Sequence, residues 1–139
     1  MPDKDYSQVP LWKKLGIKDG SSVAIVRSPE SVKFEVPRGT DLRTRPARDT
    51  DVIVVFDTKL AGLTKALASL KPKLAADGGL WVAYPKKSSS IETDLTFENV
   101  QRVGLDAGLV DNKSCAIDGN WSGVRFVYRM KDRPGSGPR

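Results

Sequence analysis

The first two-thirds of the chain alternates short apolar runs with segments of helical spacing. Val23–Val26 and Leu80–Tyr84 are apolar at every position, and Asp51–Asp57 encloses five apolar residues between two acids. Continuous runs of this length are typical of parallel strands that are covered on both faces. We therefore predict three buried strands, the central one at Asp51–Asp57, and a weak edge strand at Thr40–Arg43.

Two short helices are predicted near the amino terminus. Pro10–Leu15 has the spacing of one or two helical turns, which we expect to form a lid at the sheet edge. Pro29 fits the first turn of a second helix, with Ser28 as its cap. The apolar residues after Pro29 are irregularly spaced, so this second helix is not a long one.

The helical pattern is clearest after the central strand. Leucines recur there at alternating intervals of three and four residues, which places them on one helix face. These leucines are Leu60, Leu63, Leu67, Leu70 and Leu74. Thr58 is the predicted cap, and Asp77–Gly79 is expected to close the helix before the next strand. A further helix begins near Asp94 or Thr96 and ends at Gly108.

The carboxyl-terminal third follows a different pattern. Val110–Ile117 and Gly123–Met130 alternate apolar and polar residues around Asp118–Asn120, which predicts an antiparallel hairpin. Strands that alternate with helices and end in such a hairpin indicate an α/β fold. We expect a Rossmann-like, open, mainly parallel sheet with helices on both faces and a C-terminal antiparallel β-hairpin.

Length and composition place this fold in one domain. The chain has 139 residues, of which 39% are hydrophobic and 29% are charged, as in ordinary globular domains. We assign the domain to residues 1–131 and a disordered tail, rich in proline, glycine and arginine, to residues 132–139. No apolar run approaches the roughly twenty residues of a membrane helix. The amino terminus lacks a signal-peptide pattern, so we expect a cytoplasmic protein without a membrane partner.

Two features of the composition restrict the available chemistry. The chain contains no histidine and one cysteine. Catalysis by a Ser–His or Cys–His pair is therefore excluded, as are metal sites that need histidine or a cysteine cluster. Cys115 is predicted to be a small buried hydrophobe in a strand. We expect no metal, no cofactor and no catalytic residue, and the sequence favours a binding protein over an enzyme.

The basic residues are unevenly distributed. The chain has 23 basic and 17 acidic residues, a net charge of +6, and four of its arginines fall within residues 38–48. A second basic cluster follows the last strand, from Arg125 to Arg139. Such segments attract phosphates. Residues 38–48 contain neither aromatic side chains nor a reading helix, so we favour a solvated loop over a nucleic-acid interface.

Candidate site residues gather where the predicted strands end. Ligands of open α/β sheets bind beyond the carboxyl ends of the strands, near the point where the strand order reverses. Lys86 and Lys87 suit a phosphate or carboxylate, or else belong to a solvated loop. Asp57 is placed as a general base or as an acceptor for a ribose hydroxyl, and Trp121 either forms a pocket wall or caps the core. The full candidate set is Arg27, Ser28, Asp57, Lys86, Lys87, Ser88, Trp121 and Ser122.

A strand that ends in Asp57, a leucine-rich helix, the segment Leu70–Leu80 and a terminal hairpin follow one another. This order resembles the class I methyltransferases that use S-adenosylmethionine. Those enzymes carry a glycine-rich turn after their first strand, whereas this chain has Val26–Glu30 and no glycine between Gly20 and Gly39. The acid that holds the ribose after their second strand has no clear counterpart. The resemblance therefore implies the fold, but not use of the cofactor.

Five segments together carry a more specific resemblance. They are Pro10–Lys18, Asp77–Ser88, Thr93–Thr96, Gly108–Asp111 and Ala116–Gly123. Together they resemble a bacterial family of small uncharacterised proteins, domain of unknown function three-thousand-and-fifty-two. The resemblance covers nearly the whole chain and implies no particular activity. It directs attention to Trp81–Lys87 and Trp121–Gly123, which are predicted to lie at the same rim.

Three functions are compared. The leading hypothesis is a non-enzymatic module that binds a small anionic ligand or a protein partner at the strand-end rim, where the cations neutralise charge and Trp121 supplies apolar contact. The alternative is a divergent methyltransferase-like enzyme that positions its cofactor without the glycine turn, with Asp57 and Tyr84 as acid and base. The second alternative is nucleic-acid binding through the basic segments.

Overall fold

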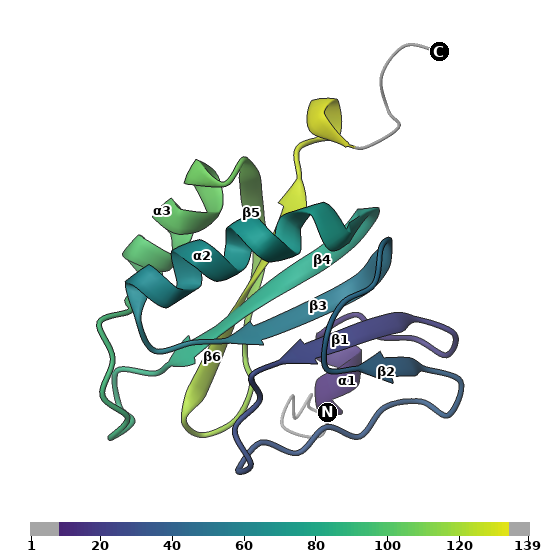
Figure 1. Ribbon diagram of the computed structural model, residues 1–139. Coiled ribbons are helices and arrows are strands. Elements are labelled where there is room, and N and C mark those ends of the chain that lie inside the picture. The colour runs from purple at the N-terminus through teal and green to yellow at the C-terminus, as the bar shows by residue number, and fades with distance from the viewer. Residues whose placement is uncertain (1–8, 134–139) are drawn as a thin grey trace, which may run out of the picture.

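The computed structural model describes residues 9–133, and its centre is a six-stranded sheet in the order β2–β1–β3–β4–β6–β5 (Figure 1). The strands are β1 (Ser22–Val26), β2 (Asp41–Arg43), β3 (Thr50–Phe56), β4 (Leu74–Pro85), β5 (Leu109–Ala116) and β6 (Trp121–Tyr128). The helices are α1 (Leu11–Lys14), α2 (Leu60–Leu70) and α3 (Phe97–Asp106), with 3-10 turns η2 (Lys71–Lys73) and η3 (Met130–Asp132). β6 is antiparallel to both its neighbours, and the pairs among β1 to β4 are parallel. The predicted α/β class and the C-terminal hairpin are confirmed.

The central strand β3 needs a hydrophobic layer on each side of the sheet. Ile53 and Val55 project to the face that carries α2, whereas Val52, Val54 and Phe56 project to the opposite face. All five are at most 5% exposed. Side chains of a strand alternate between its two faces, so a strand that is apolar at every position is stable only between two layers.

One layer is formed by α2 and α3. The connections β3–α2–β4 and β4–α3–β5 both run toward the β5 edge of the sheet, and right-handed crossovers then place both helices on the same face. Leu63 and Leu67 of α2 and Val100 of α3 are fully buried in this layer. The predicted start of α3 is confirmed, because the Thr96 hydroxyl accepts a hydrogen bond from the Asn99 amide within a reciprocal capping box.

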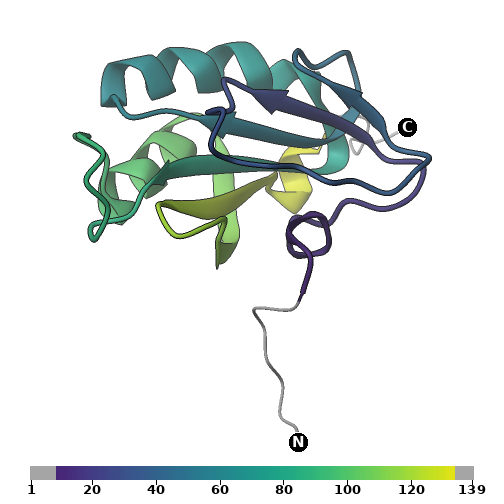
Figure 2. The ribbon, with the colours of Figure 1, turned by 90° about the horizontal axis from the view of Figure 1, so that it is seen from below.

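The opposite layer contains α1 and the extended segment 27–40, so α1 and α2 lie on opposite sides of the sheet (Figure 2). Leu15, just after α1, is buried, and its carbonyl accepts a hydrogen bond of 3.0 Å from the Trp81 indole. The prediction of a lid at the sheet edge was therefore wrong, since this segment packs on the face. The prediction of a helix after Pro29 was also wrong. Val32 and Phe34, two residues apart, pack onto this layer from an irregular extended chain.

The end of α2 differs from its prediction. The helix passes into the η2 turn at Lys71, where Pro72 follows, and Asp77–Gly79 lies inside β4. A Cβ at Gly79 would lie 2.3 Å from the Arg125 Nε, and one at Gly78 would lie 2.7 Å from a backbone oxygen. These glycines therefore permit close packing within the sheet and do not end a helix.

Three further expectations can be compared with the structure: the burial of Cys115, the extent of the domain and the absence of a membrane helix. Cys115 lies half-buried in β5, where burial raises the pKa of its thiol, so it is a protonated packing residue. The extent of the domain, residues 1–131, stays a prediction, and most of the predicted tail lies outside the described residues. No helix within residues 9–133 is long and apolar enough to cross a membrane.

Candidate functional site

The carboxyl ends of β1, β3 and β4 meet at one edge of the sheet, on the left of Figure 1. The strand order reverses between β1 and β3, because the chain proceeds from β1 to β2 on one side and from β3 to β4 on the other. Topology of this kind predicts a ligand crevice at the reversal. The structure instead separates the candidate residues into two groups, one at the reversal and one at the end of β4.

At the reversal, Arg27 and Asp57 bind each other. The Arg27 Nη1 lies 2.5 Å from the Asp57 Oδ2, and the Asp57 side chain is 9% exposed. The other oxygen, Oδ1, accepts hydrogen bonds from the backbone amides of Thr58 at 2.8 Å and Lys59 at 3.0 Å. Both carboxylate oxygens of Asp57 are therefore engaged within the protein.

The turn that carries Arg27 has the backbone of a glycine turn without the glycine. Arg27 has a φ of 60°, in the left-handed region that favours glycine. Its side chain reaches from the end of β1 to Asp57 at the end of β3. The strain of this conformation is of order 1 kcal/mol, and the ion pair with the largely buried Asp57 offsets part of it.

The start of α2 is filled by acidic side chains. Thr58, the predicted cap, makes no capping bond, and the helix begins after Lys59. Asp57 binds the two amides before the helix, and the Asp94 Oδ1 accepts a 2.7 Å hydrogen bond from the Leu60 amide. The prediction of Thr58 as cap was wrong. The carboxylates of Asp57 and Asp94, which both lie outside the helix, occupy its positive end instead. The amides of Thr58, Lys59 and Leu60 are therefore all bound by carboxylates of the chain itself.

The second group of candidates surrounds a cavity of about 600 Å³ at the carboxyl end of β4. Lys86 and Lys87 line it from the loop after β4, and Ser122 lines it from β6, opposite Tyr84 in the sheet. The Lys86 amide donates a 2.8 Å hydrogen bond to the carbonyl of Asn120 in the hairpin turn. This bond attaches the lysine loop to the hairpin turn.

The loop before α3 forms the opposite wall of the cavity, and its hydroxyl groups are used internally. The Thr93 Oγ1 donates to the Thr58 carbonyl at 2.7 Å and accepts from the Leu95 amide. The Thr96 hydroxyl caps α3, and the Ser89 hydroxyl accepts from the Ile91 amide. These groups hold the wall rigid. The sequence contains one signal for this wall, the capping pattern at Thr96, but the wall itself was not predicted.

Within residues 9–133, the polar groups of the cavity that form no side-chain hydrogen bond include the Tyr84 and Ser122 hydroxyls and the two ammonium groups. Burial, reinforced by the charge of Glu98, raises the pKa of Tyr84, so its phenol stays protonated and can donate. Glu92 and Glu98 also line the cavity. The cavity therefore presents two cations, two hydroxyl donors and two carboxylates.

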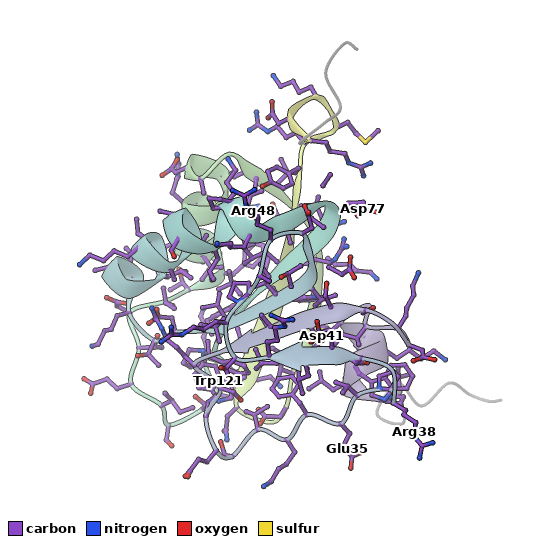
Figure 3. The ribbon with its side chains drawn as sticks, turned by 45° about the vertical axis from the view of Figure 1, so that its right-hand side comes forward. Glu35, Arg38, Asp41, Arg48, Asp77 and Trp121 are labelled. Atoms are coloured by element: carbon purple, nitrogen blue, oxygen red, sulfur yellow. The ribbon has the colours of Figure 1, made fainter. Side chains whose placement is uncertain are left out.

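The remaining candidates lie elsewhere. Trp121 is 5% exposed and packs edge-on against Phe56, with ring centroids 5.1 Å apart, so it belongs to the core (Figure 3). Ser28 donates to the neighbouring Pro29 carbonyl, and Ser88 is exposed and does not line the cavity. Trp121 therefore does not supply a pocket wall. Among the described residues, no cluster of carboxylate and cysteine ligands could hold a metal ion.

The fold matches methyltransferases of known structure. A SAM-dependent methyltransferase from Aquifex aeolicus has a TM-score of 0.63 at 13% identity, over 84% of this chain and 86% of that one. A TehB-like SAM-dependent methyltransferase from Corynebacterium glutamicum gives 0.57 at 12% identity, over 88% and 89%. A putative type 11 methyltransferase from Sulfolobus solfataricus gives 0.55 at 12% identity, over 93% of each chain. No family model matches the chain, and no curated protein matches its sequence.

These similarities confirm the methyltransferase-like layout of the chain. At identities this low they establish the fold and not the activity. The residues at the strand reversal do not fit S-adenosylmethionine. Arg27 replaces the glycine turn, Asp57 is bound to Arg27, and β2 is followed by Thr44 and Arg45 instead of an acid. We therefore derive no reaction step through this cofactor.

Proposed function

We propose that the protein is a divergent methyltransferase-like protein that binds a small anionic ligand in the cavity at the end of β4. The observation that carries this proposal is the convergence of Lys86 and Lys87 with two unengaged hydroxyl groups on one concave surface. The volume of about 600 Å³ lies within the range of small-molecule sites. Ammonium and hydroxyl donors are the groups that bind a carboxylate or a phosphate.

The charge balance of the cavity narrows the ligand class. Glu92 and Glu98 offset the two lysines, so the cavity suits one anionic group and not a polyanion. The carboxylates can accept hydrogen bonds from an amino or hydroxyl group on the same molecule. A small organic acid that carries a hydrogen-bond donor therefore fits better than a sulfate or a phosphate ion.

The second candidate is a divergent methyltransferase, and the structural neighbours are the observation that favours it. In that case Asp57 and Tyr84 would be the acid and the base. Asp57 is held by Arg27 and by two amides, and the raised pKa of Tyr84 makes it a poor base near neutral pH. This geometry supports ligand binding over catalysis.

The origin and family of the chain belong to the same proposal. The segments Asp77–Ser88 and Thr93–Thr96, which resemble a bacterial family of small proteins, are the ones that line most of the cavity. We infer a small cytoplasmic bacterial protein of that family.

A thermal-shift panel tests the proposal. The panel contains hydroxy and amino acids, inorganic phosphate, S-adenosylmethionine and its demethylated product, against the wild type, Lys86→Gln and the exposed β5 control Lys113→Gln. A ligand at a hundred times its Kd stabilises by about 2.7 kcal/mol, a shift of a few degrees. We expect an organic acid to produce this shift in the wild type and in Lys113→Gln, but not in Lys86→Gln, whose own Tm is unchanged.

Two other results would reject the proposal. Stoichiometric binding of S-adenosylmethionine to the wild type would support the methyltransferase instead. A flat response to the whole panel, with all three proteins folded, would show that the cavity is not a site for small acids.

A further inference from the structure

A second cavity, of about 580 Å³, lies on the α2 face of the sheet, beside the carboxyl ends of β1 and β2. One wall is α2, and the other is the connection from β2 to β3, residues 44–49, which Figure 1 shows running back past the end of β1. This connection contains no helix. Because an extended segment covers less of a sheet than a helix does, a groove remains beside α2.

The groove is lined by four cations and by no acid. They are Arg27, Arg45, Lys65 and Lys73. Arg27 is paired with Asp57, but within residues 9–133 no acid pairs with any of the other three. A neighbouring depression adds Arg48 beside Lys73, at the carboxyl end of α2 (Figure 3). Its single acid is Asp49.

Uncompensated cations around a concave surface repel one another, and an anion in the groove relieves that repulsion. The charge pattern differs from that of the β4 cavity, where two glutamates balance two lysines. The groove therefore suits a ligand with more than one negative charge. Lys65 and Lys73 lie eight positions apart along α2 and η2, which is about 12 Å of helix, so they can contact separate anionic groups.

The floor of the groove is apolar. Val26, Ala66 and Leu70 line it, and Thr44 and Ser69 supply hydroxyl groups at its walls. No aromatic side chain lines the groove, so it lacks the stacking surface that single-stranded nucleic acids use. Its volume matches a small molecule with an apolar body.

We propose that this basic groove is a second binding site, which takes a small organic ligand with two or more phosphate groups, such as a nucleoside diphosphate. The phosphates contact Arg45, Lys65 and Lys73, and the organic part lies on the apolar floor. The site is independent of the β4 cavity, because the two share no lining residue.

Calorimetric titration with ADP and with pyrophosphate tests the site. The variants are Lys65→Gln and Lys73→Gln, with Lys86→Gln and Lys113→Gln as controls that remove a lysine elsewhere. Loss of one charge-assisted contact is expected to weaken ADP binding about tenfold. We expect this loss in the two groove variants, unchanged binding in both controls, and weaker binding as salt is raised. Thermal melts establish that each variant is folded.

Three results would overturn the inference. One is the absence of binding of both probes at millimolar concentration. Another is equal ADP affinity in the wild type and in both groove variants, or loss of binding in Lys86→Gln, which would locate the ligand outside the groove. The third is that ADP does not bind, whereas a ten-nucleotide single strand binds the wild type and binds the groove variants more weakly. That result would assign the groove to nucleic acid.

Discussion

The strand reversal and the end of β4 lie at the same edge of the same sheet, yet they have opposite character. At the reversal, the Arg27 guanidinium binds the Asp57 carboxylate, which also accepts hydrogen bonds from the two amides that precede α2. At the end of β4, the ammonium groups of the two lysines and the Tyr84 hydroxyl line a cavity. These groups have no hydrogen-bonding partner among the described residues. Topology therefore selects where a site can form, and unengaged polar groups decide whether that place can bind a ligand.

The largest expected effect comes from removing the carboxylate at the reversal. Asp57→Ala leaves two amides and the Arg27 guanidinium without their acceptor, and we expect the free energy of unfolding to fall by about 2 kcal/mol. Most of this loss comes from the amides, because Arg27 is half exposed. Urea denaturation measures it. The control is Asp41→Ala, whose pair with Arg43 is exposed and should contribute less than about 0.5 kcal/mol. Equal losses in the two variants would mean that the interactions of Asp57 stabilise the protein no more than the exposed Asp41–Arg43 pair does.

The next effect comes from the packing of α2 against the same carboxylate. A Cβ at Gly62 would lie 2.9 Å from the Asp57 Oδ2, which the ion pair and amides hold in place. Replacing glycine by alanine within a helix usually raises the free energy of unfolding by about 1 kcal/mol. For Gly62→Ala we expect the opposite, a net decrease of about 1 kcal/mol, because the added methyl group collides with the carboxylate. A rise in stability in the same urea experiment would show that Asp57 can move aside.

At the end of β4, we expect an effect on binding and not on folding. Tyr84→Phe removes a hydroxyl without a partner among the described residues, so the Tm should not change. A neutral hydrogen bond contributes about 1 kcal/mol, so the affinity for the acid found in the panel should fall about fivefold. Unchanged affinity would exclude the phenol from the site, and a lower Tm would give it a structural role.

The smallest effect concerns pH. Burial raises the pKa of Tyr84 and of Tyr128 above the usual value of 10.0, so above that pH the folded protein holds more protons than the unfolded chain. Their contribution to stability is full below pH 10 and is lost as the pH rises through the folded pKa. Urea denaturation at pH 9 and pH 11 should therefore show a smaller decrease for Tyr84→Phe than for the wild type. An identical decrease in the two proteins would mean that groups other than Tyr84 cause the loss of stability at high pH.

The elements that follow local periodicity were predictable. The local sequence pattern alone identifies β3, the capped α3 and the β5–β6 hairpin, without knowledge of the segments that pack against them. The errors arose where a distant residue determines the local structure. The Asp94 carboxylate, from the loop before α3, binds the start of α2, and the Arg125 side chain of β6 lies directly over Gly79. Sequence spacing contains neither contact.

The candidate site was half predictable for the same reason. Lys86, Lys87 and Ser122 follow from the rule that ligands bind at strand ends, and the structure places them around one cavity. Which polar groups bind each other depends on tertiary distances, so the engagement of Asp57 by Arg27 was not visible in the sequence. The basic groove depends on residues from β1, α2 and the β2–β3 connection, which only the folded chain brings together.

The shortness of β2 has a consequence for self-association. It is an edge strand of three residues, all of them exposed, and its Leu42 is 44% exposed. An open edge with an apolar side chain is a template on which a second chain can add a strand, and proteins limit this with short strands, charge and proline. Here Arg43 ends the strand, and Arg45 and Pro46 follow after Thr44. The charged segment beside the groove thus also restricts edge-to-edge aggregation of the sheet.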